Sequence, residues 1–470
     1  MSTSDQRNGA HILVFPYPAL GHIIPLLDLT HMFLTRGLTV TVLITPPHLS
    51  LLDPLLSSHP STSIQPLLLS PPNIIPTVDS QLFRPVANAR ALSKLRNPII
   101  KWFKSHPSPP VAIISDIFLG WTHHLASHLG VPHVAFWTSS AFAASVFHTL
   151  WRDLPKVDDP TDEDAVLSMP KVPNSPKYPW WQITSLYRGF KEGNPDWEFF
   201  KNGILANGQS WGTVFNSFTE LEQVYIEHIK KEMGHDRVWG VGPLLPADED
   251  SMGPTNRGGS SSVPAHDVMG WLDSKADDSV VYVCFGSRWM LKNEQVGALA
   301  GALQCSGVHF IWCLKESDLD NVAISNGFED RVEGKGYLIK GWAAQVAILR
   351  HQAVGAFVTH CGWNSVLEGL AAGVLMLTWP VAADQFTNAK FLVDQIGVAV
   401  RFCECGTRTV PNSGELARLL AESVGGTRPE RSRVMEVCIA ASEAIKGGSS
   451  SRDMESLVNK LCGLNTQRSL

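Results

Sequence analysis

Short, continuous apolar runs alternate along this chain with longer segments of helical periodicity. In the first half, the apolar runs cover residues 11–17, 39–45, 111–115, 133–138 and 211–218. Each run has the length of a buried strand, and the segment between the first two has helical spacing and ends at Gly37. A strand, a helix and a second strand at this spacing form a right-handed βαβ unit. After the last run, Thr219 and Glu222 have the spacing of a capping box, which predicts a helix with Thr219 as its N-cap.

The C-terminal half repeats this alternation. Its apolar runs cover residues 280–285, 309–314, 337–342, 354–359, 374–379 and 398–402. Strands that alternate with helical segments indicate a second doubly wound parallel sheet. Between the halves, residues 246–264 are rich in Pro, Gly and Ser and poor in apolar groups, which is typical of a linker. We therefore expect an α/β protein with domains at 1–245 and 265–450, and a C-terminal helix at 451–470 that packs back on the first domain.

Composition narrows the class of protein. The chain has 470 residues, 44% of them hydrophobic, and a net charge of −6, which fits two large globular α/β domains. No basic run is present in the sequence, so nucleic acid is not expected as a partner. We expect neither a signal peptide nor a membrane span, because no apolar run reaches the roughly 18 residues that a span needs. The eight cysteines form no CxxC pair, and we expect them to be reduced thiols in a cytoplasmic protein.

Polar residues follow two of the N-terminal strands directly. His22 lies in the turn after the first strand, and Asp116 comes directly after the run at 111–115. Open parallel sheets bind ligands at the carboxyl ends of their strands, so both residues could take part in chemistry. Each also has an ordinary interpretation, His22 as a solvated loop residue and Asp116 as a helix cap. Only Gly21 is present where a dinucleotide-binding turn needs GxGxxG, so a nicotinamide-dependent enzyme is disfavoured.

Patterns that could bind a metal are weak. His124 and His128 have the i, i+4 spacing that can bind a metal on one helix face, with His123 beside them, but no HExxH pattern accompanies them. Three D-x-D matches, at 162–164, 248–250 and 318–320, do not directly follow a buried strand. We interpret them as solvated surface charge, and we expect no metal.

The run at 354–359 leads into a turn that suits an anion. The turn is His360-Cys361-Gly362-Trp363-Asn364-Ser365, and residues 366–373 then have the pattern of a short helix that ends at Gly373. The first N–H groups of a helix lack internal partners and carry the positive end of its dipole, so a diphosphate could bind there. Gly362 allows the backbone to approach, while His360, Asn364 and Ser365 add side-chain donors. The dipole contributes only about 1–2 kcal/mol, so the side chains must supply much of the affinity.

The stretch from Trp342 to Gln385 closely resembles the signature box of plant UDP-sugar-dependent glycosyltransferases, the family-one enzymes of the GT-B fold. The HCGWNS turn, Glu368, Trp379-Pro380 and Asp384-Gln385 all stand where that pattern has them, with no gap. An ordinary βαβ unit with a solvated turn would explain the apolar runs but not these polar residues at their spacings. Ala344 departs from the pattern, which has Pro there, and this change would leave the turn less preorganised.

The resemblance implies a role for each matching residue of the C-terminal domain. Trp342 would stack on uracil beside the backbone turn at Ala343, and Gln345 and Glu368 would hold the ribose hydroxyls. The diphosphate would be held by Ser287, His360, Gly362, Trp363, Asn364 and Ser365. The sugar would be held by Asp384 and Gln385, with Trp379 beside them. Arg288, next to Ser287, stands where the family leads us to expect Gln or a small polar residue.

In the N-terminal half, the resemblance makes His22 the catalytic base and Asp116 its partner. The GHxxP turn at His22 matches the family, and Asp116, Phe118 and Trp121 follow its D-x-F-x-x-W spacing. The carboxylate would fix the tautomer of the imidazole and stabilise the imidazolium, as in hydrolase triads. The residues that could line a sugar or aromatic acceptor pocket are Thr138, Phe118, Trp121 and Trp180.

The resemblance implies an inverting UDP-glucose-dependent O-glycosyltransferase with two facing Rossmann-like domains and a cleft between them. The acceptor would be a small phenol of the flavonoid or hydroxybenzoate type. UDP-rhamnose or UDP-xylose as the donor, and a terpenoid or hormone as the acceptor, stay open. Gln385 favours glucose, since galactose users of the family tend to have His there. UDP-sugar would be a co-substrate, no cofactor is expected, and the chain would be a monomer. A sugar-nucleotide-binding protein without activity would keep the C-terminal box but would not need His22 and Asp116.

Overall fold

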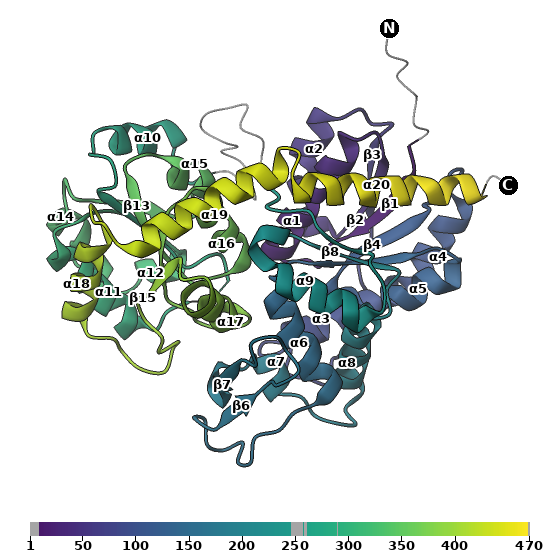
Figure 1. Cartoon of the computed structure of the whole chain (residues 1–470), viewed down its shortest axis with the longest axis horizontal. Helices are drawn as coiled ribbons and strands as arrows, with labels where there is room; N and C mark the ends of the chain where they lie inside the picture. The colour runs from purple at the N-terminus through teal and green to yellow at the C-terminus, as the bar shows by residue number, and fades with distance from the viewer. Residues whose placement is uncertain (1–8, 246–256, 258–260, 289, 469–470) are drawn as a thin grey trace, which may run out of the picture. The chain divides into compact units, whose positions relative to one another are not determined.

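The chain divides into two compact α/β units, each built on a parallel sheet (Figure 1). The computed structural model describes residues 9–245, 257, 261–288 and 290–468. Unit 1 comprises Met1–Leu244 and Ala444–Leu470, and unit 2 comprises Leu245–Glu443. The predicted α/β class is confirmed. Most of the predicted linker, residues 246–256 and 258–260, lies outside the described residues.

Unit 1 contains a seven-stranded parallel sheet in the order β3-β2-β1-β4-β5-β8-β9. Its strands are β1 His11–Phe15, β2 Thr39–Ile44, β3 Ile64–Leu68, β4 Ala112–Asp116, β5 His133–Trp137, β8 Gly212–Phe215 and β9 Val238–Gly240. All five apolar runs predicted for this half form strands, with ends that differ by a few residues. They are fully or almost fully buried, as strands covered on both faces must be.

Two edge strands, β3 and β9, were missing from the sequence prediction. Most side chains of β3 are exposed or half-buried and Pro66 lies at its centre, while β9 has only three residues. Neither segment therefore carries a continuous apolar run of strand length. An edge strand pairs on one side only, which is why proline is tolerated there.

The side chains of β1 alternate between two cores, as strand geometry requires. Ile12 and Val14 lie in a core completed by α1 (Leu20–Leu34) and α20 (Ser449–Arg468). Leu13 and Phe15 point to the other face, into a core with α4 (Arg96–Ser105) and α5 (Thr122–Leu129). The other helices of unit 1 are α2 Asp53–Ser58, α3 Arg84–Leu92, α6 Ala141–Asp153, α7 Ser185–Arg188, α8 Pro195–Asn207 and α9 Thr219–Met233. Its short elements are η1 Pro46–Leu52, η2 Ser93–Leu95, η3 Ile117–Leu119, η4 Trp180–Gln182 and the hairpin β6 Val166–Ser168 with β7 Lys177–Pro179.

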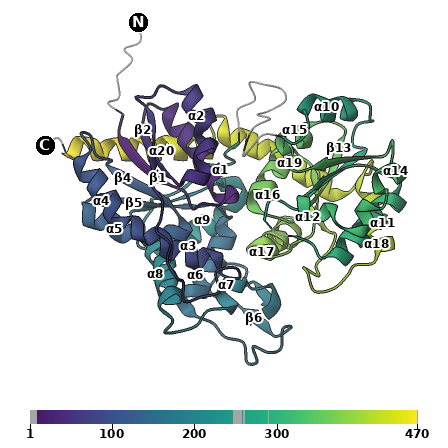
Figure 2. The same cartoon turned by 180° about the vertical axis from the view of Figure 1, so that it is seen from behind.

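The C-terminal helix α20 belongs to unit 1 and lies along its sheet (Figures 1 and 2). Leu457, Val458 and Leu461 join the same core as β1. On its polar side, Asp453 Oδ2 accepts a hydrogen bond from the N–H of Gly240 at 2.8 Å. The helix therefore covers the edge strand β9, which would otherwise expose unpaired backbone groups.

Glu222 does not form the predicted capping box. Helix α9 begins at Thr219, so its N-cap is Phe218. The buried carboxylate of Glu222 instead accepts hydrogen bonds from the N–H groups of Ala141 and Phe142, at 3.0 and 2.8 Å. These two residues begin α6, whose first N–H groups have no partners within the helix. Glu222 thus caps a helix about 80 residues earlier in the chain, which local spacing cannot indicate.

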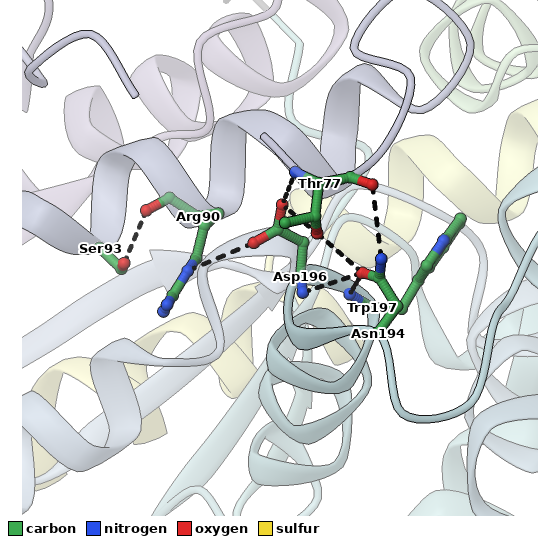
Figure 3. Close-up of polar contacts among 6 residues, drawn as sticks. All are labelled: Thr77, Arg90, Ser93, Asn194, Asp196 and Trp197. Atoms are coloured by element: carbon green, nitrogen blue, oxygen red, sulfur yellow. Dashed lines mark hydrogen bonds and ion pairs between the residues drawn. The ribbon is translucent and has the colours of Figure 1, made fainter. Parts of the chain in front are cut away.

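A polar cluster joins the loop at Thr77 to the start of α8 (Figure 3). The side-chain oxygen of Asn194 caps α8 by accepting from the N–H groups of Asp196 and Trp197, at 3.1 and 3.2 Å. The carboxylate of Asp196 accepts from the N–H of Thr77 at 2.6 Å and lies 3.4 Å from Arg90 Nε on α3. Helices α3 and α8 are thereby joined through one buried carboxylate.

Unit 2 contains a six-stranded parallel sheet in the order β12-β11-β10-β13-β14-β15. Its strands are β10 Val280–Cys284, β11 His309–Leu314, β12 Gly336–Lys340, β13 Val354–Thr359, β14 Leu375–Thr378 and β15 Ala399–Arg401. All six coincide with predicted apolar runs. Its helices are α10 Ala265–Asp273, α11 Asn293–Ser306, α12 Glu316–Leu319, α13 Val322–Ser325, α14 Phe328–Arg331, α15 Gln345–Arg350, α16 Trp363–Ala371, α17 Gln385–Lys390, the π-helix η5 Phe391–Gln395, α18 Ser413–Ser423 and α19 Pro429–Ile445.

Replacing Asp196 by Ala should destabilise unit 1. The change leaves the Thr77 N–H and the Arg90 guanidinium without their acceptor, which costs about 1–3 kcal/mol. Asp196→Asn is the matched control, because it keeps an acceptor for Thr77 but loses the charge opposite Arg90, and its stability should be intermediate. Urea unfolding followed by tryptophan fluorescence measures the difference. An Asp196→Ala protein as stable as the wild type would contradict this role.

Candidate active site

The strand order of unit 1 reverses between β1 and β4. At such a point the two adjacent loops leave in opposite directions, and ligands bind beside the carboxyl ends of the strands. His22 lies in the first turn of α1, directly after β1, and Asp116 is the last residue of β4. Both predicted catalytic residues are therefore at the switch point of the sheet.

His22 and Asp116 form a hydrogen-bonded pair. His22 Nδ1 lies 2.7 Å from Asp116 Oδ2, and Asp116 Oδ1 accepts from the N–H of Phe118 at 2.9 Å. The Asp116 side chain is fully buried, whereas that of His22 is 19% exposed. Because the carboxylate accepts the hydrogen on Nδ1, it selects the tautomer in which Nε2 has a free lone pair. The pair can therefore take up a proton at Nε2.

Aromatic rings surround His22. The rings of Tyr17 and Phe118 have centroids 5.2 and 5.0 Å from that of the imidazole. Phe118 in turn contacts Phe147 and Phe200, at 6.4 and 5.7 Å. Of these four rings, only Phe118 was predicted. The position of Tyr17, two residues past β1, gives the same signal that selected His22, whereas Phe147 and Phe200 come from α6 and α8 and reach the site only through packing.

The other residues predicted for an acceptor or sugar pocket divide into two groups. Thr138 lies at the site, with Oγ1 3.2 Å from His22 Nδ1. Trp121 is buried in the core, where its ring centroid is 6.2 Å from that of Phe15. Trp180 lies beside Tyr187, with centroids 6.1 Å apart. No ring contact joins either tryptophan to His22 among the described residues, and their role in a pocket stays a prediction.

The strand order of unit 2 reverses between β10 and β13. Ser287 follows β10 and is exposed, and His360 directly follows β13. Helix α16 begins at Trp363 with Gly362 as its N-cap, three residues earlier than predicted. Trp363, Asn364 and Ser365 therefore form the first turn of the helix. Its unpaired N–H groups and dipole make this end of α16 a place for an anion.

The imidazole of His360 is packed between two glycine backbones. A methyl group on Gly286 would lie 2.6 Å from His360 Nε2, and one on Gly362 would lie 2.5 Å from the same atom. Both positions therefore need glycine. Burial, and secondly the charge of Lys315, lowers the pKa of His360 to about 3. The ring is thus neutral at neutral pH and can offer a hydrogen bond but no charge. Its buried Nδ1 has no hydrogen-bond partner within the described part of the chain.

Three residues predicted for the nucleoside and phosphate subsites lie together. Gln345 Nε2 donates to Ser365 Oγ at 3.0 Å and to Glu368 Oε2 at 2.6 Å. Gln345 Oε1 accepts from the Tyr282 hydroxyl at 3.2 Å. The Glu368 carboxylate also forms an ion pair with Arg257. Tyr282 and Arg257 were not predicted, because one lies inside a buried strand and the other inside the predicted linker.

Trp342 is half-buried and is joined to the same group. Its Nε1 donates to the carbonyl oxygen of Arg257 at 3.2 Å. The next residue, Ala343, accepts from the N–H of Gln345 at 2.8 Å. Ala344 is the N-cap of α15 and has a φ of −73°. Proline fixes φ near −65°, so Ala344 keeps the backbone angle that the proline of the family pattern would impose.

The residues predicted for the sugar lie at the start of α17. Asp384 is the N-cap of this helix, and its Oδ2 accepts from Asn388 Nδ2 at 2.9 Å. Gln385 Oε1 accepts from the N–H groups of Val381 and Ala382, at 2.8 and 2.9 Å. The carbonyl end of Gln385 therefore holds the preceding loop, and its amide NH2 is the end that could face a ligand. Trp379 is fully buried, and its ring lies 5.4 Å from that of Phe285.

Two non-glycine residues next to these groups have left-handed backbone angles. Cys361 has a φ of 64° and Ala383 a φ of 57°. Such angles are unfavourable for residues with a Cβ and persist only where the surroundings hold them. The surroundings of Cys361 do so, because its N–H donates to Thr359 Oγ1 at 3.1 Å and its carbonyl accepts from Asn388 at 2.9 Å. Strained turns thus precede both α16 and α17.

The described residues contain no group of three or more His, Cys, Asp or Glu side chains that could hold a metal ion. The D-x-D match at 162–164 is exposed, the one at 318–320 lies at α12, and the one at 248–250 falls outside the described residues. Arg288 is exposed, and all eight cysteines are free thiols. None of the helices in the described ranges is long and apolar enough to cross a membrane.

Comparisons with known proteins identify the family. A family profile described as UDP-glucoronosyl and UDP-glucosyl transferase matches residues 255–413. The chain is 51% identical to UDP-glycosyltransferase 89B2 of Stevia rebaudiana, over 98% of this chain and 100% of that protein. It is 49% identical to flavonol 3-O-glucosyltransferase UGT89B1 of Arabidopsis thaliana, over 100% of both. The chain belongs to the plant UDP-glycosyltransferases. The crystal structure of Arabidopsis thaliana UGT89C1 complexed with UDP-L-rhamnose matches this glycosyltransferase with a TM-score of 0.79 and 38% identity, over 97% of this chain and 100% of that one. UGT89C1 has also been solved in complex with quercetin.

These matches confirm the family, the transferase activity and the GT-B class of fold that the box at 342–385 predicted. They extend over nearly the whole chain, beyond the C-terminal half in which the box lies. The roles of individual residues in this glycosyltransferase stay predictions.

Gly362→Ala should weaken the binding of UDP to this glycosyltransferase by about 10-fold or more, the loss expected for one hydrogen bond to a charged group. Alanine adopts the φ of −62° at Gly362 readily, so the change tests only the clash of the new methyl group with His360. Gly270→Ala in α10 is the matched control, because a methyl group there meets nothing within 4 Å. Calorimetric titration with UDP gives both affinities. Unchanged UDP binding by Gly362→Ala would remove His360 from the donor site.

Proposed function

We propose that this glycosyltransferase transfers glucose from UDP-glucose to a hydroxyl group of a flavonoid-type phenol, with inversion at the anomeric carbon. The observation that carries the proposal is the 2.7 Å hydrogen bond between His22 and Asp116. This pair lies at the switch point of its sheet among aromatic rings, which suits a planar phenol. Flavonol 3-O-glucosyltransferase UGT89B1 at 49% identity, and the complex of UGT89C1 with quercetin, support the class of acceptor.

In the proposed mechanism, His22 Nε2 accepts the proton of the phenol as the phenolic oxygen attacks the anomeric carbon. The bond from that carbon to the diphosphate oxygen breaks, and its electron pair leaves with UDP. A single displacement of this kind inverts the configuration and gives a β-glucoside. Histidine suits this role because it exchanges protons near neutral pH. Asp116 stabilises the imidazolium that forms.

We assign the acceptor to unit 1 and the UDP-sugar to unit 2, with the domains at 1–245 and 265–450. Trp342 would stack on uracil, while Gln345 and Glu368 would hold the ribose. Glu368 would then exchange part of its ion pair with Arg257 for the ribose hydroxyls. The diphosphate would bind at the start of α16 with His360, Asn364 and Ser365, and the sugar would bind at Asp384 and Gln385.

Glucose is the proposed donor sugar, and rhamnose is the second candidate. Glucose is supported by Gln385 and by the glucosyltransferase relative UGT89B1. Rhamnose is supported by the complex of UGT89C1 with UDP-L-rhamnose and by flavonol 7-O-rhamnosyltransferase of Arabidopsis thaliana, each 38% identical to this chain. The lower identity of these two proteins is why glucose comes first.

A screen of donors against acceptors tests the proposal. UDP-glucose, UDP-rhamnose and UDP-xylose are each incubated with a flavonol, a hydroxybenzoate and a terpenoid alcohol, with and without EDTA, and products are detected by mass spectrometry. We expect a hexose adduct of the flavonol from UDP-glucose, unaffected by EDTA. A deoxyhexose adduct formed in preference would replace glucose by rhamnose. Failure of every pair to release UDP would point to a sugar-nucleotide-binding protein without activity.

His22→Ala should lower kcat by about 10²- to 10⁴-fold, the usual contribution of a general base. Asp116→Asn should also lower kcat, because an amide can select the wrong tautomer of the imidazole. The UDP affinity of both variants should stay unchanged, since the donor residues belong to unit 2. His128→Ala, at an exposed position of α5, is the matched control and should keep full turnover. Wild-type kcat in the His22→Ala enzyme would place the base elsewhere.

A further inference from the structure

The leaving diphosphate needs more positive charge than the residues assigned above supply. When the bond to the anomeric carbon breaks, its electron pair stays on UDP, which gains one negative charge. Among the residues assigned to the donor, Glu368 and Asp384 are acidic. Burial holds the pKa of His360 near 3, so that ring is uncharged. Stabilising a charge that develops in the transition state is commonly the largest contribution to catalysis, so a cation close to α16 would have a large effect.

Lys315 lies at the edge of the sheet where this charge develops. It directly follows β11, the neighbour of β10. Cys313 on β11 is level with Cys284 on β10, so Lys315 and Gly286 are each two residues past that level. Neighbouring strands lie about 4.8 Å apart. Gly286 is itself packed against His360, because a methyl group on it would lie 2.6 Å from the ring. Lys315 and His360 therefore flank the same loop, the one that carries Ser287.

The charge of Lys315 reaches the groups around this loop. It is the second cause, after burial, of the lowered pKa of His360. The pKa of the Cys284 thiol is lowered mainly by its hydrogen bond with Cys313, and the charge of Lys315 adds to this effect. The lysine side chain is half-buried, and burial lowers its own pKa while the nearby Asp318 carboxylate raises it. The N–H of Lys315 donates to Asp318 Oδ2 at 2.9 Å. An ammonium group in such partly desolvated surroundings interacts with a second anion more strongly than it would in water.

We propose that the ammonium group of Lys315 binds the diphosphate of the UDP-sugar and stabilises the charge that UDP gains when the glycosidic bond breaks. This inference rests on the proposed function and adds to it the residue that neutralises the leaving group. Lys315 transfers no proton in this step, since the proton of the acceptor goes to His22 Nε2. A lysine suits the task because its ammonium is a compact charge on a flexible stem that can follow a phosphate oxygen.

Comparing UDP with uridine isolates the diphosphate. Lys315→Met should weaken UDP binding by about 10-fold or more, the usual loss for a hydrogen bond to a charged group, and should change uridine binding less than about 2-fold. Lys315→Arg should restore most of the UDP affinity. Lys335→Met is the matched control, because Lys335 is exposed and precedes β12, at the opposite edge of the same sheet. It removes the same charge and should affect neither ligand. Calorimetry with the full chain at two salt concentrations gives all the affinities, and the UDP affinity of the wild type should fall more steeply with salt than that of Lys315→Met.

Each outcome decides between named alternatives. Equal losses of UDP and uridine affinity in Lys315→Met would show that the lysine only supports the fold. Wild-type UDP affinity in Lys315→Met would show that Lys315 only neutralises Asp318. Either result overturns the inference and leaves the proposed function intact. A wild-type chain that binds no UDP would overturn both.

Discussion

The chemistry of both units depends on one property of open parallel sheets: at the point where the strand order reverses, adjacent loops diverge and leave the carboxyl ends of two strands uncovered. In unit 1 this point brings together His22 and Asp116, which are 94 residues apart in the chain. In unit 2 it packs Gly286 against His360. Neither meeting needs a local motif, because the register of the strands sets it. Strand order therefore determines which side chains can meet, and the side chains then determine what they can do.

The two imidazoles at these points have opposite surroundings. His22 is partly exposed and has a buried carboxylate on Nδ1, which favours a positive charge on the ring. His360 is enclosed by two glycine backbones and kept neutral by burial. A reaction that collects one proton and releases one diphosphate needs both kinds of histidine. It also needs a permanent cation, because neither ring can serve as one at neutral pH while the donor is bound.

The sequence predicted the fold best where strands are buried on both faces. All six strands of unit 2 and the five inner strands of unit 1 appear as apolar runs, whereas the edge strands β3 and β9 do not. The donor residues could be named because they lie close together in one stretch of the chain. Tyr282, Phe147 and Phe200 could not, since only packing brings them to their sites. Glu222 was misassigned for the same reason, because its partners at the start of α6 lie about 80 residues earlier.

Helix α20 gives the chain an unusual order of assembly. Unit 1 is interrupted by the whole of unit 2, and Leu457, Val458 and Leu461 enter its core from the far end of the sequence. During synthesis from the N-terminus, the sheet of unit 1 emerges from the ribosome first but lacks the helix that covers β9. Unit 2 consists of one continuous segment and can fold before that helix exists. A nascent chain thus carries an incomplete first unit throughout the translation of the second, and its unpaired strand edge is open to wrong partners until the last residues are made.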